Sequence, residues 1–241
     1  MNLLFLDTET TDLEQKRLVQ LAYKKWGGDD IFDLMFKPPI PIGAGASSVS
    51  HITNEDVADC QAFAESEDAG VLGELLKDHV LVAHNAKFDI EVLANEGVQT
   101  HNYICTQKIA QHFLDNPDIE KFSLQYLRYY LGLYRDEPKD RHIAHDALGD
   151  IMVLENLFKY LFDIIKNSTG KGDKEVIVDM INISVNPLLL RRITYGKHNG
   201  KTYEQVARED ASYLTWIRDK KDGASEDELF TVNHHIAKIY S

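Results

Sequence analysis

Four acidic residues and one histidine are spaced so that they could surround divalent metal ions. The first two, Asp7 and Glu9, follow an apolar run at residues 3–6 that is long enough for one buried strand. Residues two apart in a strand share a face, so these carboxylates would repel each other and lose water unless a cation lay between them. Ordinary surface acids at a strand end are the alternative for this pair taken alone.

A third acid, Asp89, is expected close to a strand end and a helix start. Residues 81–83 are apolar, and the apolar spacing over residues 90–94 predicts a helix. Open α/β sheets usually bind their ligands in such a region. Aspartate also often caps the first turn of a helix, so Asp89 alone does not distinguish a metal ligand from a helix cap.

The fourth acid, Asp150, and the histidine, His145, precede a helix with apolar residues at positions 151, 154, 157, 158 and 161. Five residues rotate a side chain by about 140° on an ideal helix, so both groups could not converge from mid-helix positions. We therefore predict that His145 lies on the loop or first turn and that Asp150 points in from the helix. This would place a mobile base beside a fixed ligand, and a purely structural histidine is the alternative.

Taken together, these segments resemble the DEDD superfamily of 3′–5′ exonucleases, in its histidine-bearing (DnaQ-like) branch. The family motifs are Asp-x-Glu, Asn-x-x-Phe-Asp and His-x-Ala-x-x-Asp, found here at residues 7–9, 85–89 and 145–150. The resemblance covers about residues 1–165. Weaker support comes from His51 after a small-residue loop at 43–50, and from Cys105-Thr106 before a helical run at 108–114. One departure is Asp12, where relatives commonly have glycine. This difference affects the geometry of the turn and none of the metal ligands.

The resemblance implies a two-metal phosphodiesterase that shortens a strand from its 3′ end and releases nucleoside 5′-monophosphates. Asp7 would bridge two ions, Glu9 and Asp150 would complete the first site, and Asp89 would hold the second ion. Because the ligands are hard oxygen donors, Mg²⁺ or Mn²⁺ is the expected metal. The unperturbed pKa of histidine, about 6.5, would let His145 accept the proton of the attacking water. The substrate contacts expected in this part of the chain are Thr8, Thr10, His51, Asn85 and Phe88.

The elements that must position these groups predict an α/β fold. Strand patterns at residues 3–6, 17–25 and 31–36 are joined by short polar links, with a hairpin turn at 27–30. A Pro/Gly loop at 38–45 and alternating helices and strands follow, up to a helix that ends near residue 165. This order fits a ribonuclease H-like mixed five-stranded sheet flanked by helices.

A polar stretch at residues 167–174 has the composition of a linker, so we expect an exonuclease domain at 1–166 and a small α+β module at 175–241. In the module we predict a strand at 191–196, a tight turn at 198–201 and a capping box that starts a helix at Thr202 and Gln205. The stretch from residue 195 to Trp216 resembles the small carboxy-terminal module of exodeoxyribonuclease X-like proteins.

The module carries four cations within an acid-free stretch, which we expect to contact a nucleic-acid backbone: Arg191, Arg192, Lys197 and Lys201. Solvated cations without a ligand are the alternative. The aromatic residues Tyr195, Tyr203 and Trp216 could stack on bases, but we favour a small core, since large aromatic side chains more often bury.

The formal net charge of −13 argues against a protein that clamps nucleic acid. Residues 171–241 carry equal numbers of acids and bases, so the excess lies in the predicted catalytic part, where bound divalent ions would offset some of it. A single-stranded 3′ end of DNA is the expected partner, and a second copy of the chain is an alternative partner, in a homodimer. Two cysteines and no membrane-spanning or leader pattern predict a cytoplasmic protein that has no membrane partner.

Three other functions fit parts of the pattern. An exoribonuclease of the ribonuclease T or oligoribonuclease kind, or a proofreading subunit of a polymerase, would use the same five residues. A non-catalytic nucleic-acid-binding protein of the same fold should lack at least one of them, and all five are present.

Overall fold

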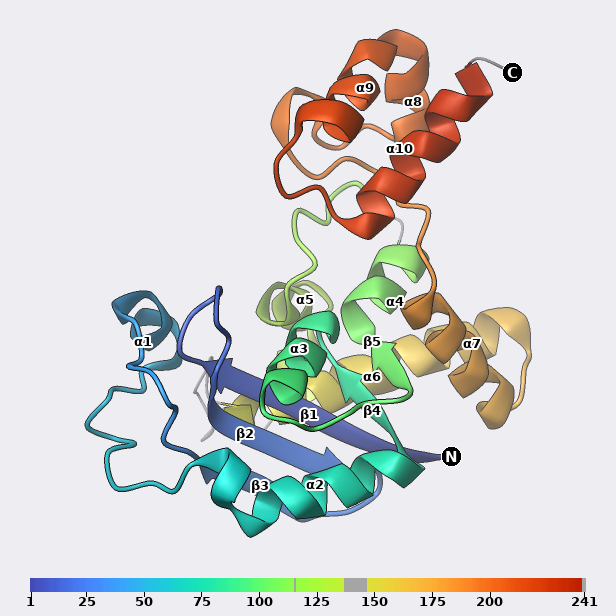
Figure 1. Cartoon of the computed structure of the whole chain (residues 1–241). Coiled ribbons are helices and arrows are strands. Elements are labelled where there is room, and N and C mark those ends of the chain that lie inside the picture. Colours follow the sequence, from blue (N-terminus) through green and yellow to red (C-terminus); the bar gives the residue numbers. More distant parts are fainter. Residues whose placement is uncertain (115, 137–146, 240–241) are drawn as a thin grey trace.

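A five-stranded mixed sheet forms the centre of the larger part of the molecule (Figure 1). The computed structural model describes residues 1–114, 116–136 and 147–239. The strands lie in the order β3-β2-β1-β4-β5, with β1 antiparallel to β2 and parallel to β4. This confirms the predicted ribonuclease H-like sheet. The strand bounds are β1 Asn2–Thr10, β2 Leu18–Lys25, β3 Ile31–Met35, β4 His79–Ala83 and β5 Tyr103–Cys105.

Both faces of the sheet are buried, because successive side chains of β1 point alternately into two hydrophobic clusters. Leu4 and Leu6 pack into one hydrophobic cluster with α2 (Glu67–Asp78) and α3 (Lys87–Asn95). Leu3 and Phe5 point to the other face and pack into a second cluster. That second cluster is covered by α4 (Thr106–Phe113), α5 (Leu124–Tyr130), α6 (Ala147–Thr169) and α7 (Asp173–Val185).

The segment that follows β3 differs from the sequence expectation. We expected a small-residue loop over 43–50, whereas Ala44–Ser50 forms the short helix α1. Alanine and serine permit a helix when tertiary contacts favour it, and α1 packs beside β1. Short 3₁₀ turns also occur at Phe63–Glu65 (η1), Leu133–Asp136 (η2) and Gly196–His198 (η3).

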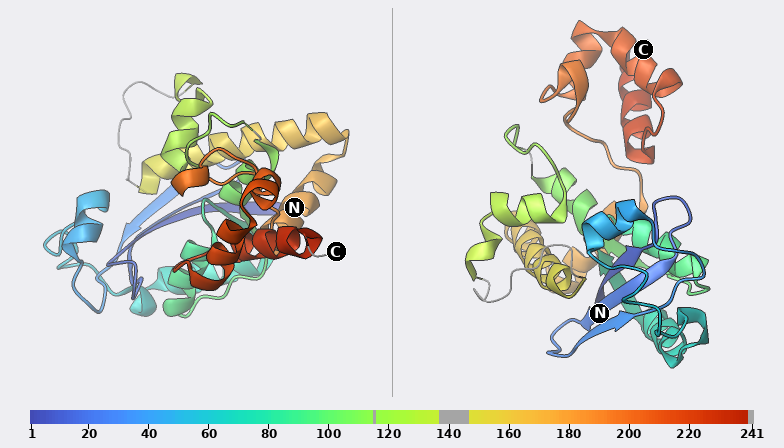
Figure 2. Two further views of the ribbon diagram at one scale, coloured as in Figure 1. Left: turned by 90° about the horizontal axis from the view of Figure 1, so that it is seen from above. Right: turned by 90° about the vertical axis from the view of Figure 1, so that its left-hand side faces the viewer.

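The C-terminal helices form a separate unit that stands away from the sheet (Figure 2). Its elements are α8 (Tyr203–Glu209), α9 (Ala211–Lys220) and α10 (Glu226–Ile239). They enclose a small core that includes Tyr203, Leu214 and Val232. The predicted capping box at the start of α8 is confirmed. The Thr202 hydroxyl accepts a hydrogen bond from the Gln205 backbone N–H, and the Gln205 side-chain oxygen accepts one from the Thr202 backbone N–H.

The predicted strand over 191–196 is wrong in its extent. Only an isolated bridge pairs Arg192 with Thr202, and residues 196–198 turn into η3. Gly196 adopts a φ of 63°, a left-handed conformation that ends any extended run at this point.

The proposed linker at 167–174 overlaps the end of α6 and the start of α7, two helices that pack on the same core. Helix α6 continues to Thr169, and α7 contributes Val176, Ile177 and Met180 to the cluster beneath the sheet. The division of the chain at this point stays a prediction. Within the described ranges, the helices are too short or too polar to cross a membrane.

Candidate active site

The first two acids lie on the last part of β1, where the strand leaves the core. Asp7 and Glu9 are half-buried and follow Leu3 and Phe5 on the sheet face that α6 covers. Strands β1 and β4 are parallel, so their carboxyl ends meet at this edge of the sheet. The strand positions therefore place both carboxylates where α/β sheets bind ligands.

Asp89 lies at the same edge, in the first turn of α3. The helix begins after Ala86, which excludes Asp89 as the N-cap residue. The Thr8 hydroxyl donates a hydrogen bond of 2.8 Å to the Asp89 carboxylate. Burial raises the pKa of Asp89 to about 7, because a carboxylate without water around it is costly to ionise. A bound cation would stabilise the ionised form.

The turn between β4 and α3 has a special backbone conformation. Asn85 has a φ of 65°, a region that asparagine tolerates better than most residues, and its carbonyl accepts a hydrogen bond from the Phe88 amide. The preceding His84 uses both ring nitrogens, at 2.9 Å from the Thr106 hydroxyl and 2.7 Å from the Phe122 carbonyl. Burial lowers the pKa of His84 to about 4, so the ring is neutral and structural.

Asp150 is buried in the first turn of α6. Its carboxylate accepts a hydrogen bond from the Gln125 amide, and the Arg128 guanidinium donates in turn to the Gln125 side-chain oxygen at 3.1 Å. We did not predict Gln125 or Arg128 from the sequence. They lie on α5, which forms contacts with α6 that local spacing does not reveal.

His145 lies outside the described residues, which stop at Asp136 and resume at Ala147. Its placement on a loop or first turn therefore stays a prediction. Asp150 lies in the first turn of the helix that begins at Ala147.

The carboxylates face protein partners in this structure. Asp89 is bonded to Thr8 and Asp150 to Gln125. Across residues 1–114, 116–136 and 147–239, no three His, Cys, Asp or Glu side chains are close enough together to hold a metal ion. The donor set still fits Mg²⁺ or Mn²⁺ chemically, because all four groups are hard oxygen donors on adjoining elements. A bound ion would have to compete with Gln125 for Asp150.

The other residues predicted near the substrate surround this edge. Thr10 is buried and donates to the Asp12 carbonyl at 3.1 Å, and His51 is exposed at the end of α1 with a φ of 60°. Phe88 is half-buried below the Lys16 ammonium group, 5.7 Å from the ring centre. The contact of these residues with a substrate stays a prediction.

Asp12, the departure from the family pattern, has a structural explanation. Its carboxylate accepts backbone hydrogen bonds from Gln15 at 2.5 Å, Glu14 at 2.8 Å and Lys16 at 3.3 Å. These bonds, led by that of Gln15, lower the pKa of Asp12. The side chain thus stabilises a turn that a glycine would form by backbone freedom.

The stretch that carries the cations of the C-terminal unit contains no acids, but acids from a later part of the sequence lie beside two of these cations. In space, Lys197 pairs with Asp210 at 2.7 Å, and Lys201 pairs with Glu209 at 2.5 Å. Arg192 donates to the Gly200 carbonyl at 3.1 Å, and Arg191 is exposed. The pairing acids come later in the sequence, where α8 folds back, so local composition could not show them.

The aromatic residues of this unit divide into two groups. Tyr203 is buried in the unit's core, as the core interpretation requires, and Tyr195 donates a hydrogen bond to Glu228. Trp216 is 43% exposed, which leaves its ring open to contact with a ligand.

The comparisons with known proteins agree with these motifs. A model of the Exonuclease family matches residues 4–158, which contain Asp7, Glu9, Asp89, His145 and Asp150. The chain belongs to this exonuclease family. It is a 3′–5′ exonuclease of the DEDD superfamily, as the sequence motifs predicted.

One sequence relative of this exonuclease matches it well beyond the family domain. Exodeoxyribonuclease 10 of Escherichia coli K12 is 30% identical over 234 residues, which cover 96% of this chain and 97% of that protein. The DNA polymerase III subunit epsilon of Treponema pallidum is 29% identical over 163 residues, covering 63% of this chain and 72% of that one.

Two solved structures share the fold. Exonuclease X in complex with 5′ overhanging duplex DNA superposes with a TM-score of 0.57 at 29% identity, covering 76% of this chain and 99% of that chain. Escherichia coli Exonuclease I in complex with a dT13 oligonucleotide has a TM-score of 0.52 at 17% identity, covering 74% of this chain and 45% of that chain. The second likeness concerns the fold alone.

Proposed function

We propose that this exonuclease hydrolyses DNA from its 3′ end and releases nucleoside 5′-monophosphates. The observation that carries the proposal is the 30% identity to Exodeoxyribonuclease 10, which spans both the catalytic part and the C-terminal unit. Its site geometry is compatible with this reaction, because Asp7 and Glu9 share one face of β1 and Asp150 lies in the first turn of the helix that packs on that face.

The four carboxylates would hold two divalent ions, Mg²⁺ or Mn²⁺. Asp7, Glu9 and Asp150 would hold one ion, and Asp89 would hold the other together with Asp7. When bound, such a pair of ions stabilises the attacking and leaving oxygens of an in-line displacement. Asp89 supports the assignment, since burial raises its pKa to about 7 and a bound cation would stabilise its ionised form.

The protein side chains would supply proton transfer and orientation. We propose His145 as the general base that takes the proton of the attacking water. Thr8 and Gln125 would orient Asp89 and Asp150, because each donates a hydrogen bond to its carboxylate. Such supporting bonds commonly tune metal ligands.

The substrate strand would be held at two places. Near the reacting phosphate we propose Thr8, Thr10, His51, Asn85 and Phe88, which surround the carboxyl ends of β1 and β4. Farther away, the backbone would contact the C-terminal unit through Arg191, Arg192, Lys197 and Lys201. Lys201 can exchange its exposed partner Glu209 for phosphate, since such surface pairs contribute little stability. Lys197 would have to leave Asp210, which is 22% exposed and also bonded to Ser212 and His198.

We propose that the enzyme acts in the cytoplasm in DNA repair, as a monomer or a homodimer. A proofreading subunit is the second candidate, favoured by the 29% identity to a polymerase III epsilon subunit. A stand-alone enzyme should degrade DNA at full rate without a polymerase, whereas a proofreading subunit should be stimulated by one.

The substrate assignment is tested with matched 5′-labelled DNA and RNA oligonucleotides, single- and double-stranded, in Mg²⁺ or Mn²⁺. We expect ladders that shorten from the 3′ end, with DNA degraded faster than RNA. Asp7→Asn serves as the matched inactive control. Faster degradation of RNA would overturn the DNA proposal and favour an exoribonuclease.

A further inference from the structure

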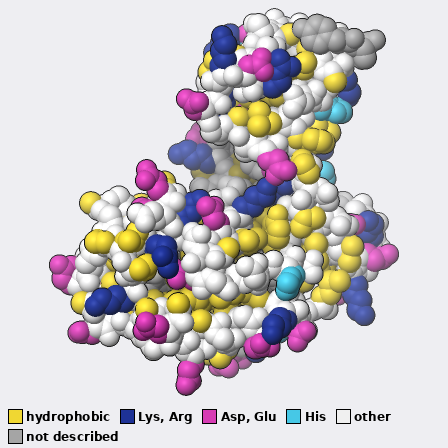
Figure 3. Space-filling view, in the orientation of Figure 1, with side chains coloured by type: hydrophobic (Ala, Val, Ile, Leu, Met, Phe, Trp, Pro, Cys, Tyr) yellow, Lys and Arg dark blue, Asp and Glu magenta, His cyan; other side chains and the backbone are white. Residues whose placement is uncertain are grey.

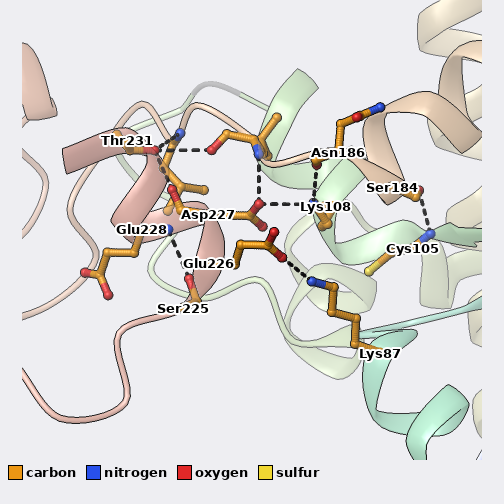
Figure 4. A network of polar contacts seen from close by, with 12 residues as sticks. Lys87, Cys105, Lys108, Ser184, Asn186, Ser225, Glu226, Asp227, Glu228 and Thr231 are labelled. Carbon is orange, nitrogen blue, oxygen red and sulfur yellow. Dashed lines mark hydrogen bonds and ion pairs between the residues drawn. The ribbon is translucent and has the colours of Figure 1, made fainter. Parts of the chain in front are cut away.

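Two lysines of the catalytic part meet the acidic first turn of α10 (Figure 4). The Lys87 ammonium group lies 2.5 Å from the Glu226 carboxylate, and Lys108 lies 3.0 Å from Asp227. Figure 3 shows basic and acidic side chains meeting at the narrow waist between the two parts of the molecule. Although Glu226 and Asp227 are neighbours in the sequence, the two ion pairs differ in their environment.

The Lys108–Asp227 pair is built into the structure. Its side chains are only 9% and 16% exposed. Lys108 also donates to the Asn186 carbonyl at 2.7 Å, and Asp227 accepts from the Leu188 amide at 2.8 Å. Because these groups satisfy one another away from water, separating them would be costly. This pair fixes the C-terminal unit to the catalytic part.

The Lys87–Glu226 pair is open to solvent and exchangeable. Its side chains are 58% and 59% exposed, and one hydrogen bond joins them. Exposed pairs of this kind contribute little to stability and are screened by salt. A phosphate group could therefore replace the Glu226 carboxylate at Lys87 without disturbing the fixed pair.

Lys87 is placed where a substrate phosphate would approach. It lies two residues before Asp89, at the start of α3, and lines a cavity of about 240 Å³ with Asn85, Gln107 and Glu226. The catalytic part carries the protein's whole excess of negative charge. A nucleic-acid strand that enters this acidic region needs the cations that lie beside the Asp89 motif. In this structure Glu226 neutralises one of them, Lys87.

We propose that Lys87 binds a backbone phosphate of the nucleic-acid substrate, and that Glu226 of the C-terminal unit covers Lys87 until a strand displaces it. This rests on the proposed function and names a substrate-binding residue and a competing carboxylate within it. The C-terminal unit thus has two effects near the site. Asp227 holds the unit in place. Glu226 competes with the substrate phosphate for Lys87 and so weakens the binding of strands that do not displace it.

The test measures binding apart from hydrolysis. A fluorescein-labelled single-stranded DNA oligonucleotide is titrated with the full chain in EDTA, and anisotropy gives the dissociation constant across a salt series. Glu226→Gln should bind about two- to fivefold more tightly than wild type at low salt, the range that an exposed ion pair provides. Lys87→Gln should bind more weakly, with a salt slope shallower by about 0.7.

Two controls make the effect specific. Glu74→Gln removes another exposed acid, which pairs with Lys77 on α2, and it should leave binding unchanged. In the Lys87→Gln background, adding Glu226→Gln should have no further effect. Unchanged melting temperatures and circular dichroism spectra establish that the variants remain folded.

Three results would overturn the proposal. Glu226→Gln could bind like Glu74→Gln, it could bind more weakly than wild type, or it could bind more tightly even without Lys87. Hydrolysis by the wild-type chain in Mn²⁺ is recorded in parallel. Failure of that hydrolysis would overturn the proposed function, whereas normal hydrolysis with any of the three binding results would overturn the role of Lys87 alone.

Discussion

Thr8 and Asp89, 81 residues apart, are joined by a buried hydrogen bond of 2.8 Å in which the threonine hydroxyl donates to the carboxylate. Thr8 stands between Asp7 and Glu9 on β1, so its side chain points to the opposite face of the strand. The Asp-Thr-Glu motif therefore contributes two candidate ligands and also orients a third.

Removing this hydroxyl should weaken metal binding. Thr8→Val keeps the shape of the side chain but leaves the buried Asp89 without its donor. We expect Mn²⁺ affinity to fall about tenfold or more, the range seen for groups that support metal ligands. Calorimetric titration measures the affinity, and Thr8→Ser, which keeps a hydroxyl, should restore most of it. Equal affinities in the valine and serine variants would contradict the role of the hydroxyl.

The raised pKa of Asp89 predicts a pH-dependent stability of the metal-free protein. The folded pKa of about 7 exceeds the unfolded value of 3.8, so the folded state binds more protons between these pH values. The contribution of this group to stability is present below pH 3.8 and is lost as pH rises to about 7. Asp89→Asn removes the titration, so its stability relative to wild type should increase over this window, by up to about 1.4 kcal/mol per pH unit.

Urea denaturation of both proteins in EDTA, at several pH values from about 5 to about 8.5, measures this difference. The difference in unfolding free energy between Asp89→Asn and wild type should level off above about pH 7.5, once Asp89 is ionised in the folded state. A gap that does not change with pH would show that Asp89 keeps an ordinary pKa.

The base and a ligand should respond differently to alanine. His145→Ala is expected to retain metal binding but lose about 10²–10⁴-fold in rate, the usual range for general acid–base catalysis. Asp150→Ala should weaken metal binding, because it removes a charged oxygen donor. Mn²⁺ titrations and turnover at saturating metal separate the two cases. Loss of metal affinity in both variants would make His145 a ligand.

The effect of shortening the chain should depend on whether α7 is kept. A chain that ends at Asn186 keeps the core packing of α7, and it should fold and digest short single strands. It should bind long strands more weakly, and its salt slope should be shallower by about 0.7 for each phosphate that the C-terminal unit no longer neutralises. Anisotropy across a salt series measures this slope. An unchanged slope would remove the C-terminal unit from substrate binding.

A chain that ends near Lys166 should not fold stably. It lacks Val176, Ile177 and Met180, three side chains of the core beneath the sheet. Circular dichroism and thermal melting of the two truncations should differ sharply, and a cooperative transition in the shorter one would show that α7 is dispensable.

Local patterns predicted the elements whose signals lie within a few residues. The alternation on β1, the helix start before Asp89 and the capping box at Thr202 and Gln205 all depend on neighbours along the chain. The helix at 44–50 could not be predicted in this way, because its small residues have weak preferences and packing beside β1 decides its conformation.

Pairings between distant residues could not be predicted either. Gln125 meets Asp150 only because α5 packs on α6, and Glu226 meets Lys87 across 139 residues. The acids that pair with Lys197 and Lys201 likewise depend on how α8 folds back. Sequence spacing identified the candidate ligands, while their hydrogen-bond partners follow from tertiary packing.

The activity of Asp7→Ala tests most directly the claim that hydrolysis occurs at these carboxylates. Wild type and variant are compared on a 5′-labelled single-stranded DNA oligonucleotide at saturating Mn²⁺, with thermal melting in EDTA as the folding control. We predict that the variant retains less than about one thousandth of wild-type activity, given the several kcal/mol that metal-ion catalysis supplies, and that it melts no lower than wild type because like charges are removed. A folded variant with more than that residual activity would contradict the assignment of the active site.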